Sequence, residues 1–144
     1  MTHEGLSRAE FAFPGPLRDA LVSAVLGGHK VSTTSLLREY ELEASPLPEP
    51  GDRSVVVDSK NQAVAIIETT SVKVVRLGSV DLSHVIDEGE GFNSVAEWRT
   101  GHEGFWHSDE LRRALCEPTF TVDDDTPVVL ERFRIVDRLD DTLS

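Results

Sequence analysis

The sequence has little cysteine, no signal-peptide pattern and no long apolar run, and each shortage excludes a class of protein. A single cysteine, Cys116, excludes an intrachain disulfide and any cysteine-rich metal centre. The longest apolar runs, such as residues 63–67, are far shorter than the roughly 20 residues of a membrane-spanning helix. Because the first residues also lack a basic region followed by an apolar one, the sequence predicts a cytoplasmic protein with no membrane partner.

Basic residues are scarce as well. The 144 residues include 14 Lys and Arg against 26 Asp and Glu, which gives a formal net charge of −12. Such a chain repels the phosphate backbone at long range, so duplex DNA is an unfavourable partner, although a small basic pocket on an acidic body remains compatible with these numbers. The length suits one domain, and 39% hydrophobic with 28% charged residues is a globular composition.

Several motifs that hold cofactors or metals are missing. No glycine-rich phosphate loop and no zinc-protease or zinc-deaminase pattern occurs. The five histidines lack a compact ligand spacing, and the run 123–125 of three Asp lacks the glycine and the downstream Glu of a calcium loop. We therefore expect no metal and no cofactor, and we interpret the Asp run as a solvated turn.

Apolar periodicity predicts three helical regions and a capped fourth helix. Residues 16–28 carry apolar side chains at offsets 0, 3, 4, 7 and 8 and end on two glycines. Residues 36–44 and 80–91 also suit helical turns, and Ser94 with Glu97 forms a capping box that opens another helix. The expected buried stripe of the first helix is Leu17, Ala20, Leu21, Ala24 and Val25. The expected stripe of the last helix, more suited to the core than to a binding site, is Val95, Trp98, His102, Phe105 and Trp106.

The middle and the end of the chain predict strands. Residues 54–58 and 63–77 are rich in Val, Ile and Thr, the second run being one bent strand or two, and residues 127–136 form a closing strand. In that last strand Arg132 and Arg134 alternate with apolar residues, so they either line a barrel mouth or face water. The order of elements predicts an α+β fold, a small mixed β-barrel with helical additions.

One polar cluster can carry chemistry. The run from Gly28 to Ser35 places Lys30 just after a glycine helix cap and before four consecutive hydroxyl residues. If Lys30 and Thr33 both turn inward, an amine whose pKa is lowered by burial can activate the hydroxyl as a nucleophile. The alternative is a polar strand edge with an exposed lysine, and the residues alone leave both open.

Four segments, in this order, resemble the successive signatures of the ASCH domain family: LGGHKVSTTSLLREYE, PGDRSVVVDSKNQAVAIIETTSVKVV, IDEGEGFNSVAEWRTGHEGFW and PVVLERFRIV. The resemblance runs from about residue 11 to about residue 136. It implies a PUA-like β-barrel of five to six strands with flanking helices and a cleft beside the GxKxxT element. We therefore expect an N-terminal extension at 1–10, an ASCH domain at 11–137 and a tail at 138–144.

The resemblance also implies a role linked to RNA or nucleosides. One branch of the family removes the acetyl group from acetylated cytidine with a threonine, a lysine and a glutamate, whereas other members are ribonuclease-like or bind RNA. Three functions thus stay open: an amide hydrolase for acylated cytidine-type nucleosides, a binding module for single-stranded RNA, and a metal-independent ribonuclease. The oligomeric state is left open.

Matching the motifs residue by residue makes Lys30, Thr33 and Glu90 the implied catalytic residues, with Glu88 as the alternative to Glu90. Lys30 would take the proton of Thr33, and Glu90 would orient Lys30 or protonate the leaving amine. This sequence departs from the family at His29, where many relatives carry arginine, and at Phe92-Asn93, where relatives often carry Asp-Arg. The expected substrate-binding residues are His29, Thr34, Ser35, Tyr40, Glu88 and His102.

Overall fold

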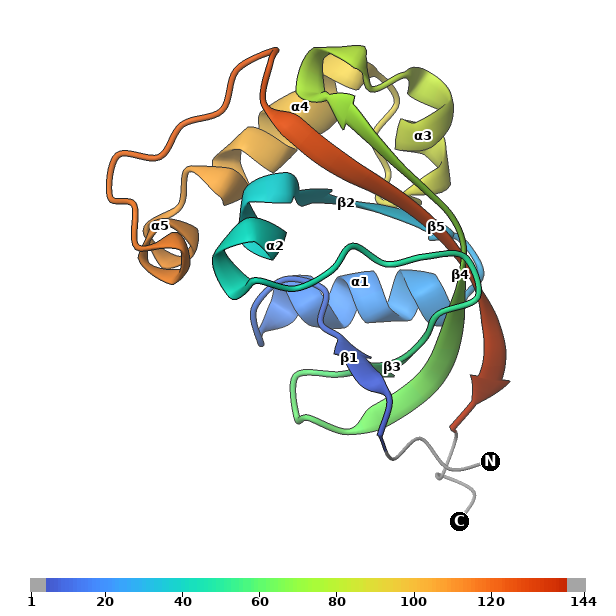
Figure 1. Cartoon of the computed structure of the whole chain (residues 1–144). Helices are drawn as coiled ribbons and strands as arrows, with labels where there is room; N and C mark the ends of the chain where they lie inside the picture. The colour runs from blue at the N-terminus through green and yellow to red at the C-terminus, as the bar shows by residue number, and fades with distance from the viewer. Residues whose placement is uncertain (1–4, 140–144) are drawn as a thin grey trace.

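A computed structural model describes residues 5–139, which form a strongly curled five-stranded sheet with helices packed around it (Figure 1). The strand order is β1-β3-β4-β5-β2; β1 pairs with β3 in parallel, and every other pairing is antiparallel. The strands are β1 (Ser7–Ala9), β2 (Ser32–Leu36), β3 (Arg53–Val57), β4 (Ala63–Arg76) and β5 (Pro127–Arg138). The expected α+β barrel-like fold is confirmed.

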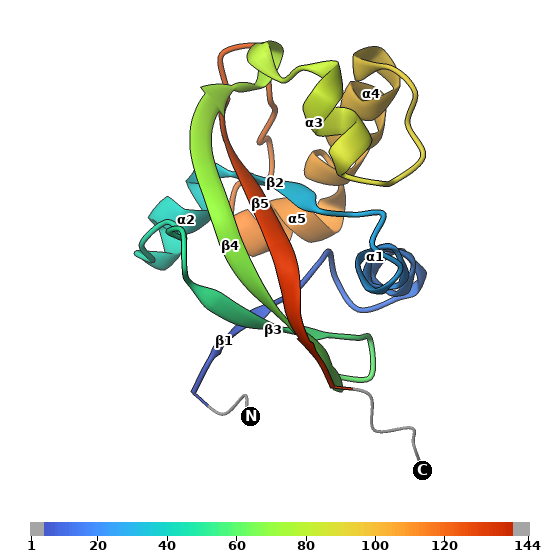
Figure 2. The same ribbon diagram turned by 90° about the vertical axis from the view of Figure 1, so that its right-hand side faces the viewer.

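The two long strands give the sheet its curl. β4 is one bent strand rather than two, and it runs beside β5 along most of its length (Figure 2). Their register shifts between Ile66 and Ile67 and again between Thr69 and Ser71. Such bulges bend a strand and increase its twist, so the sheet closes towards a half-barrel instead of staying flat.

Helices cover both ends of this half-barrel. They are α1 (Pro16–Leu26), α2 (Leu37–Glu43), α3 (Leu82–Asp87), α4 (Val95–Trp106) and α5 (Asp109–Leu115), with a short 3₁₀ turn at Leu77–Ser79. The N-cap of α4 is confirmed, because the Ser94 hydroxyl accepts a hydrogen bond from the Glu97 amide. The reciprocal half of the predicted capping box is wrong, because the Glu97 carboxylate accepts the Asn93 N–H instead of the Ser94 N–H. The sequence reasoning missed α5, although Ser108 caps it in the same way. It also missed β1.

The core has two parts that flank the sheet. One lies under α3, α4 and α5 and centres on the fully buried Trp98, and the other lies between α1 and the strands β3, β4 and β5. The second part consists of Phe11, Val22, Val25, Val56, Ala65, Ile67 and Phe133. Three polar residues of β2, Thr33, Thr34 and Ser35, line cavities beside these apolar clusters.

The predicted apolar stripe of α1 is wrong in part. Leu17 is 51% exposed and Ala20 faces water, whereas Arg18 is 3% exposed. The helix is rotated by about one residue, or roughly 100°, because the guanidinium of Arg18 finds acceptors inside the fold. It donates to the Ala12 carbonyl at 2.7 Å and to Glu10 at 3.2 Å. A long stem with a satisfied head group can replace an apolar side chain in this position.

The sequence left Arg132 and Arg134 undecided, and the structure places both on the outside of the sheet. Arg132 pairs with Asp87 at 2.5 Å, and Arg134 pairs with Glu68 at 3.3 Å. The expected extension and tail fall partly on residues 1–4 and 140–144, which lie outside the described residues. Within 5–139, no helix combines the length and the hydrophobicity that a membrane crossing needs.

Candidate functional site

The loop that carries Lys30 is held against the end of α3. After α1, Gly28 adopts φ +80°, and the amides of His29 and Lys30 both bond to the Ala24 carbonyl. The amide of Val31 then donates to the Asp87 carbonyl at 2.9 Å. The start of β2 is therefore fixed beside the turn that contains Glu88 and Glu90, far away in the sequence.

Lys30 is a buried ammonium with three acceptors. Its side chain is 1% exposed, and its Nζ donates to Glu90 Oε2 at 2.8 Å and to the Ser32 carbonyl at 2.9 Å. The Glu88 carbonyl lies at 3.5 Å, and the ring of Phe11 lies 5.8 Å away. The inward orientation of Lys30 that the sequence left open is thus the observed one.

Glu90 completes this pair at the edge of the cleft. Burial raises the pKa of Glu90; the charge of Lys30 lowers it, but the nearby Glu88 carboxylate raises it again, and the net pKa is above the usual range. The side chain of Glu90 is 17% exposed, so it meets solvent while Lys30 does not. A carboxyl with a raised pKa beside a buried amine can share a proton with that amine.

Glu88 is the fully buried anchor beneath the pair. Its side chain is 0% exposed, and the carboxylate receives the indole N–H of Trp98 at 3.0 Å and the hydroxyl of Thr34 at 2.5 Å. The Nε2 atoms of His84 and His102 lie 2.9 and 3.2 Å from the same carboxylate. All lone pairs of Glu88 that face the protein are therefore occupied.

The charge state of Glu88 follows from these bonds. Burial by itself would raise the pKa of Glu88, but hydrogen bonds from His102 and His84 and the charge of Lys30 outweigh burial and hold its pKa far below the usual range. Glu88 is thus an ionised carboxylate without access to a substrate, which favours Glu90 over Glu88 for any role in the cleft.

Neighbouring hydroxyls on β2 point in opposite directions. Successive strand residues face opposite sides of a sheet, so Thr34 turns towards Glu88 and His84, whereas Thr33 and Ser35 turn to the other side. Thr33 has no hydrogen bond to Lys30 within the described part of the chain, although both line one cavity.

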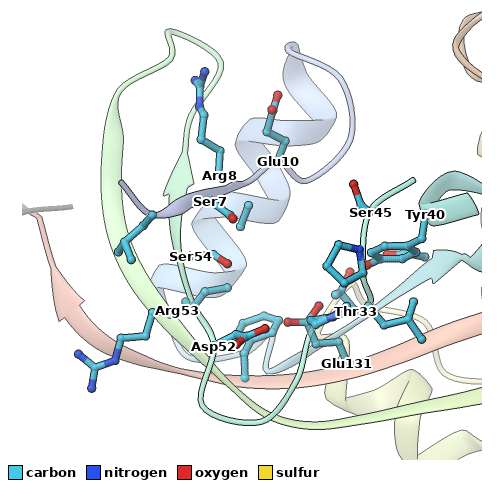
Figure 3. A pocket seen from close by; sticks show the side chains of 18 of the residues that line it. Ser7, Arg8, Glu10, Thr33, Tyr40, Ser45, Asp52, Arg53, Ser54 and Glu131 are labelled. Carbon is cyan, nitrogen blue, oxygen red and sulfur yellow. The ribbon is translucent and has the colours of Figure 1, made fainter. Parts of the chain in front are cut away.

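Two adjoining cavities meet at Thr33. The smaller, about 460 Å³, opens onto Lys30, Glu90 and His102, and the larger, about 730 Å³, opens onto Tyr40 and Glu131. Figure 3 shows the larger one, with Thr33, Tyr40 and Glu131 close together, while the guanidinium of Arg53 extends away. Residues that line both cavities are Glu10, Phe11, Thr33, Ser35, Glu39 and Glu43.

Most of the expected site residues come together here. Lys30, Thr33, Thr34, Ser35, Glu90 and His102 line the smaller cavity, and Tyr40 joins Thr33 and Ser35 in the larger one. Burial raises the pKa of the Tyr40 phenol, and the Ser35 hydroxyl partly offsets this. His29 is exposed and lines neither of these two cavities.

Sequence reasoning missed three residues of this site. His84 and Trp98 bind Glu88, and Glu131 lies directly opposite Thr33 in the β2–β5 pairing. A weak signal exists for two of them. His84 precedes Glu88 by four positions in a predicted helix, and Glu131 shares the parity of the apolar Phe133 in a predicted strand.

A metal ion has one possible set of donors among residues 5–139. Ligand atoms of Glu88, Glu90 and His102 lie within 4.8 Å of one another. The ammonium of Lys30, 2.8 Å from Glu90, already supplies the positive charge that these carboxylates require. A divalent cation would have to compete with Lys30, so the donor set fits an ion pair better than a metal centre.

Comparison with known proteins agrees with this geometry. The model of the ASCH domain matches residues 9–137. The chain belongs to the ASCH domain family. Family membership and the PUA-like fold support an RNA-related function.

Two solved structures share the fold over nearly the whole chain. Protein EF3133 from Enterococcus faecalis V583 is 26% identical with a TM-score of 0.79, covering 92% of this chain and 77% of its own. An ASCH domain from Lactobacillus crispatus JV V101 is 26% identical with a TM-score of 0.78, covering 92% of this chain and 80% of its own. A search of curated proteins finds no match.

Substitution of Gly89 tests how closely the turn after α3 packs against the loop that carries Lys30. It adopts φ +64°, and a Cβ there would overlap the His29 carbonyl and lie 2.7 Å from the Lys30 nitrogen. Gly89→Ala should therefore lower the free energy of unfolding by at least about 2 kcal/mol. Gly91→Ala, at φ +91° in open space, is the matched control and should cost about 1 kcal/mol. Urea unfolding measures both, and equal losses would contradict close packing of the loops.

Proposed function

We propose that this protein hydrolyses the amide bond of an acylated cytidine-type nucleoside, with Thr33 as nucleophile and the Lys30–Glu90 pair as its charged partner. The observation that supports this most is a buried ammonium whose carboxyl partner opens onto the same cavity as the Thr33 side chain. An amide needs both a nucleophile and a cationic donor for the oxygen that becomes negative in the transition state.

Lys30 suits the role of that donor. Three acceptors hold its Nζ in place, so the charge is positioned before a substrate arrives. Because the Lys30 side chain is shielded from solvent, its charge stabilises a developing oxyanion more than a charge in solution would. Glu90 orients Lys30, and because burial raises the pKa of Glu90, the pair can share a proton as the reaction proceeds.

Thr33 suits the role of nucleophile better than the adjacent Thr34, whose hydroxyl is already bound. The Thr34 hydroxyl is bound to Glu88 and lies 2.7 Å from His84, whereas the Thr33 side chain lines both cavities. A hydroxyl fixed between an anion and an imidazole is poorly placed to attack a substrate. The GxKxxT spacing therefore selects the first threonine of the pair.

The charges around the cavities favour a small neutral substrate. Carboxylates outnumber basic groups on both cavity walls, and Arg18, which lines the smaller cavity, is already paired with Glu10. The arginines on the outside of the sheet, Arg132 and Arg134, are also paired with carboxylates. An RNA strand would have to displace these partners, which weakens the case for an RNA-binding surface here.

Thr33→Ala should reduce the release of cytidine from acetylated cytidine by at least about 10³-fold, because the nucleophile is removed. Chromatography of the free nucleoside measures the rate. Thr100→Ala, the same change at an exposed position of α4, should leave the rate within about twofold and serves as control. Equal rates for Thr33→Ala and the wild type would remove Thr33 from this role.

Lys30→Met should lower kcat strongly and leave Glu90 without its partner. Removing one member of a buried ion pair costs about 3–5 kcal/mol of stability, so the variant needs a check by thermal unfolding. The double variant Lys30→Met with Glu90→Gln removes both charges and should recover much of that stability without recovering activity. Recovery of activity in the double variant would show that the charges are dispensable.

An RNA-binding function gives a different result. A single-stranded oligoribonucleotide should show no retention on the immobilised protein at about 50 mM salt, because the net charge of −12 repels phosphates. Salt-dependent retention would support the RNA-binding alternative instead. Cleavage of the same oligonucleotide in the presence of a chelator would support a metal-independent ribonuclease.

A further inference from the structure

We infer that Glu131 is the general base that takes the proton of the Thr33 hydroxyl, and that Thr69 positions it. This inference rests on the proposed function of Thr33 as nucleophile and assigns the remaining proton transfer of the reaction. Glu131 belongs to neither of the segments that carry Lys30 and Glu90. It lies on β5, on the far side of Thr33 from the ion pair.

The sheet register brings the two side chains together. Thr33 and Glu131 are direct partners in the antiparallel pairing of β2 with β5. The Cβ atoms of such partners are about 4.5–5.5 Å apart and lie on the same face. Figure 3 shows both side chains at the same wall of the larger cavity. A carboxylate at this position can reach a threonine hydroxyl through an ordinary rotamer.

Lys30 is less suited to this proton transfer than Glu131. Its Nζ faces Glu90 and the carbonyls of Ser32 and Glu88, and each of these acceptors requires an N–H from the amine. A lone pair directed at Thr33 would need Lys30 to leave its buried acceptors, which is costly. Lys30 therefore supplies charge and donors while another group accepts the proton.

One carboxylate oxygen of Glu131 is held by a hydrogen bond from a neighbouring strand. The hydroxyl of Thr69, a residue 3% exposed on β4, donates to Glu131 Oε2 at 2.7 Å. That bond holds one oxygen of a side chain that lines the larger cavity, and Oε1 has no hydrogen bond within residues 5–139. Burial raises the pKa of Glu131, the Thr69 bond lowers it and the Asp52 charge raises it, with a net rise. A carboxylate with a raised pKa is a stronger base.

The proton transfers balance over one turnover. The Thr33 proton moves to Glu131 as the Thr33 oxygen bonds to the acyl carbon. The π-electron pair of the substrate carbonyl then moves onto the carbonyl oxygen, which lies beside Lys30. The oxyanion pair then reforms the carbonyl as the C–N bond breaks, and the leaving nitrogen takes the proton from Glu131. Water attacks the acyl-threonine ester in the same way, losing its proton to Glu131, which returns it to the Thr33 oxygen. The products are the free acid and the amine.

Glu131→Gln should lower kcat by about 10²–10⁴-fold with little change in KM. The amide oxygen can still accept the Thr69 hydroxyl, so the fold is retained. Glu110→Gln, the same loss of charge at an exposed position of α5, is the matched control and should keep wild-type kcat. Glu131→Asp should restore part of the activity, because it keeps the carboxylate.

The pH profile separates a base from a merely structural residue. Two titratable groups interact with Glu131: Asp52, from the loop before β3, and Tyr40, from α2. Other charged groups on the wall of the same cavity are Arg8, Glu10, Glu39, Glu43 and Arg53. Activity should fall on the acidic side as Glu131 is protonated. Thr69→Val removes a bond that lowers this pKa, so the acidic limb should move to higher pH. Asp52→Asn removes a charge that raises the pKa of Glu131, so the acidic limb of the profile should move to lower pH. The amide oxygen of the new side chain can still accept the Glu49 N–H.

Acylation by 4-nitrophenyl acetate tests Glu131 without the nucleoside. Mass spectrometry should find an acetyl adduct on Thr33 that forms at least tenfold faster in the wild type than in Glu131→Gln. Equal acylation rates, or a pH limb unmoved by both neighbouring variants, would overturn the inference. If Thr33 is acylated with this dependence on Glu131 but acetylated cytidine is not cleaved, the base is correct and the proposed substrate is wrong.

Discussion

The burial of the Lys30 ammonium is the constraint on which the site depends. Moving a charge out of water costs several kcal/mol, and the structure offsets this with Glu90 and with two backbone carbonyls. Those acceptors come from β2 and from the turn after α3, so both segments must be fixed before the charge is satisfied. Gly89, whose Cα lies against the His29 backbone, allows that approach. The buried charge of Lys30 and the packing of the two loops thus stabilise each other.

The second buried charge of the site, Glu88, makes the hydroxyls of β2 differ in their hydrogen bonding. It binds Thr34 on one face of the strand, together with Trp98 and the two histidines, and this leaves Thr33 on the other face facing the cavities. Strand alternation directs the side chains of the two adjacent threonines to opposite faces of the strand, although both residues line part of the smaller cavity. Glu88 therefore holds one threonine in a structural hydrogen bond, while the next threonine lines the cavities.

The sequence predicts what is local and misses what the sheet register brings together. The helix cap at Ser94, the bent strand β4 and the order of the family motifs all follow from spacing along the chain. Glu131 could not be found that way, because its closeness to Thr33 depends on a pairing across nearly a hundred residues. The rotation of α1 was missed for another reason. Hydrophobicity alone gives no account of Arg18, which is buried because Ala12 and Glu10 accept its hydrogen bonds.

The acidity of the chain acts on the site as well as on its partners. Burial is the main reason that the pKa values of Glu90 and Glu131 are raised, yet each also has an acidic neighbour that raises its pKa further, Glu88 for the first and Asp52 for the second. Carboxyls that exchange protons at neutral pH need such shifts. An excess of negative charge around a single buried lysine thus repels long polyanions and, in the same arrangement, moves two carboxyls towards the range in which they can transfer protons.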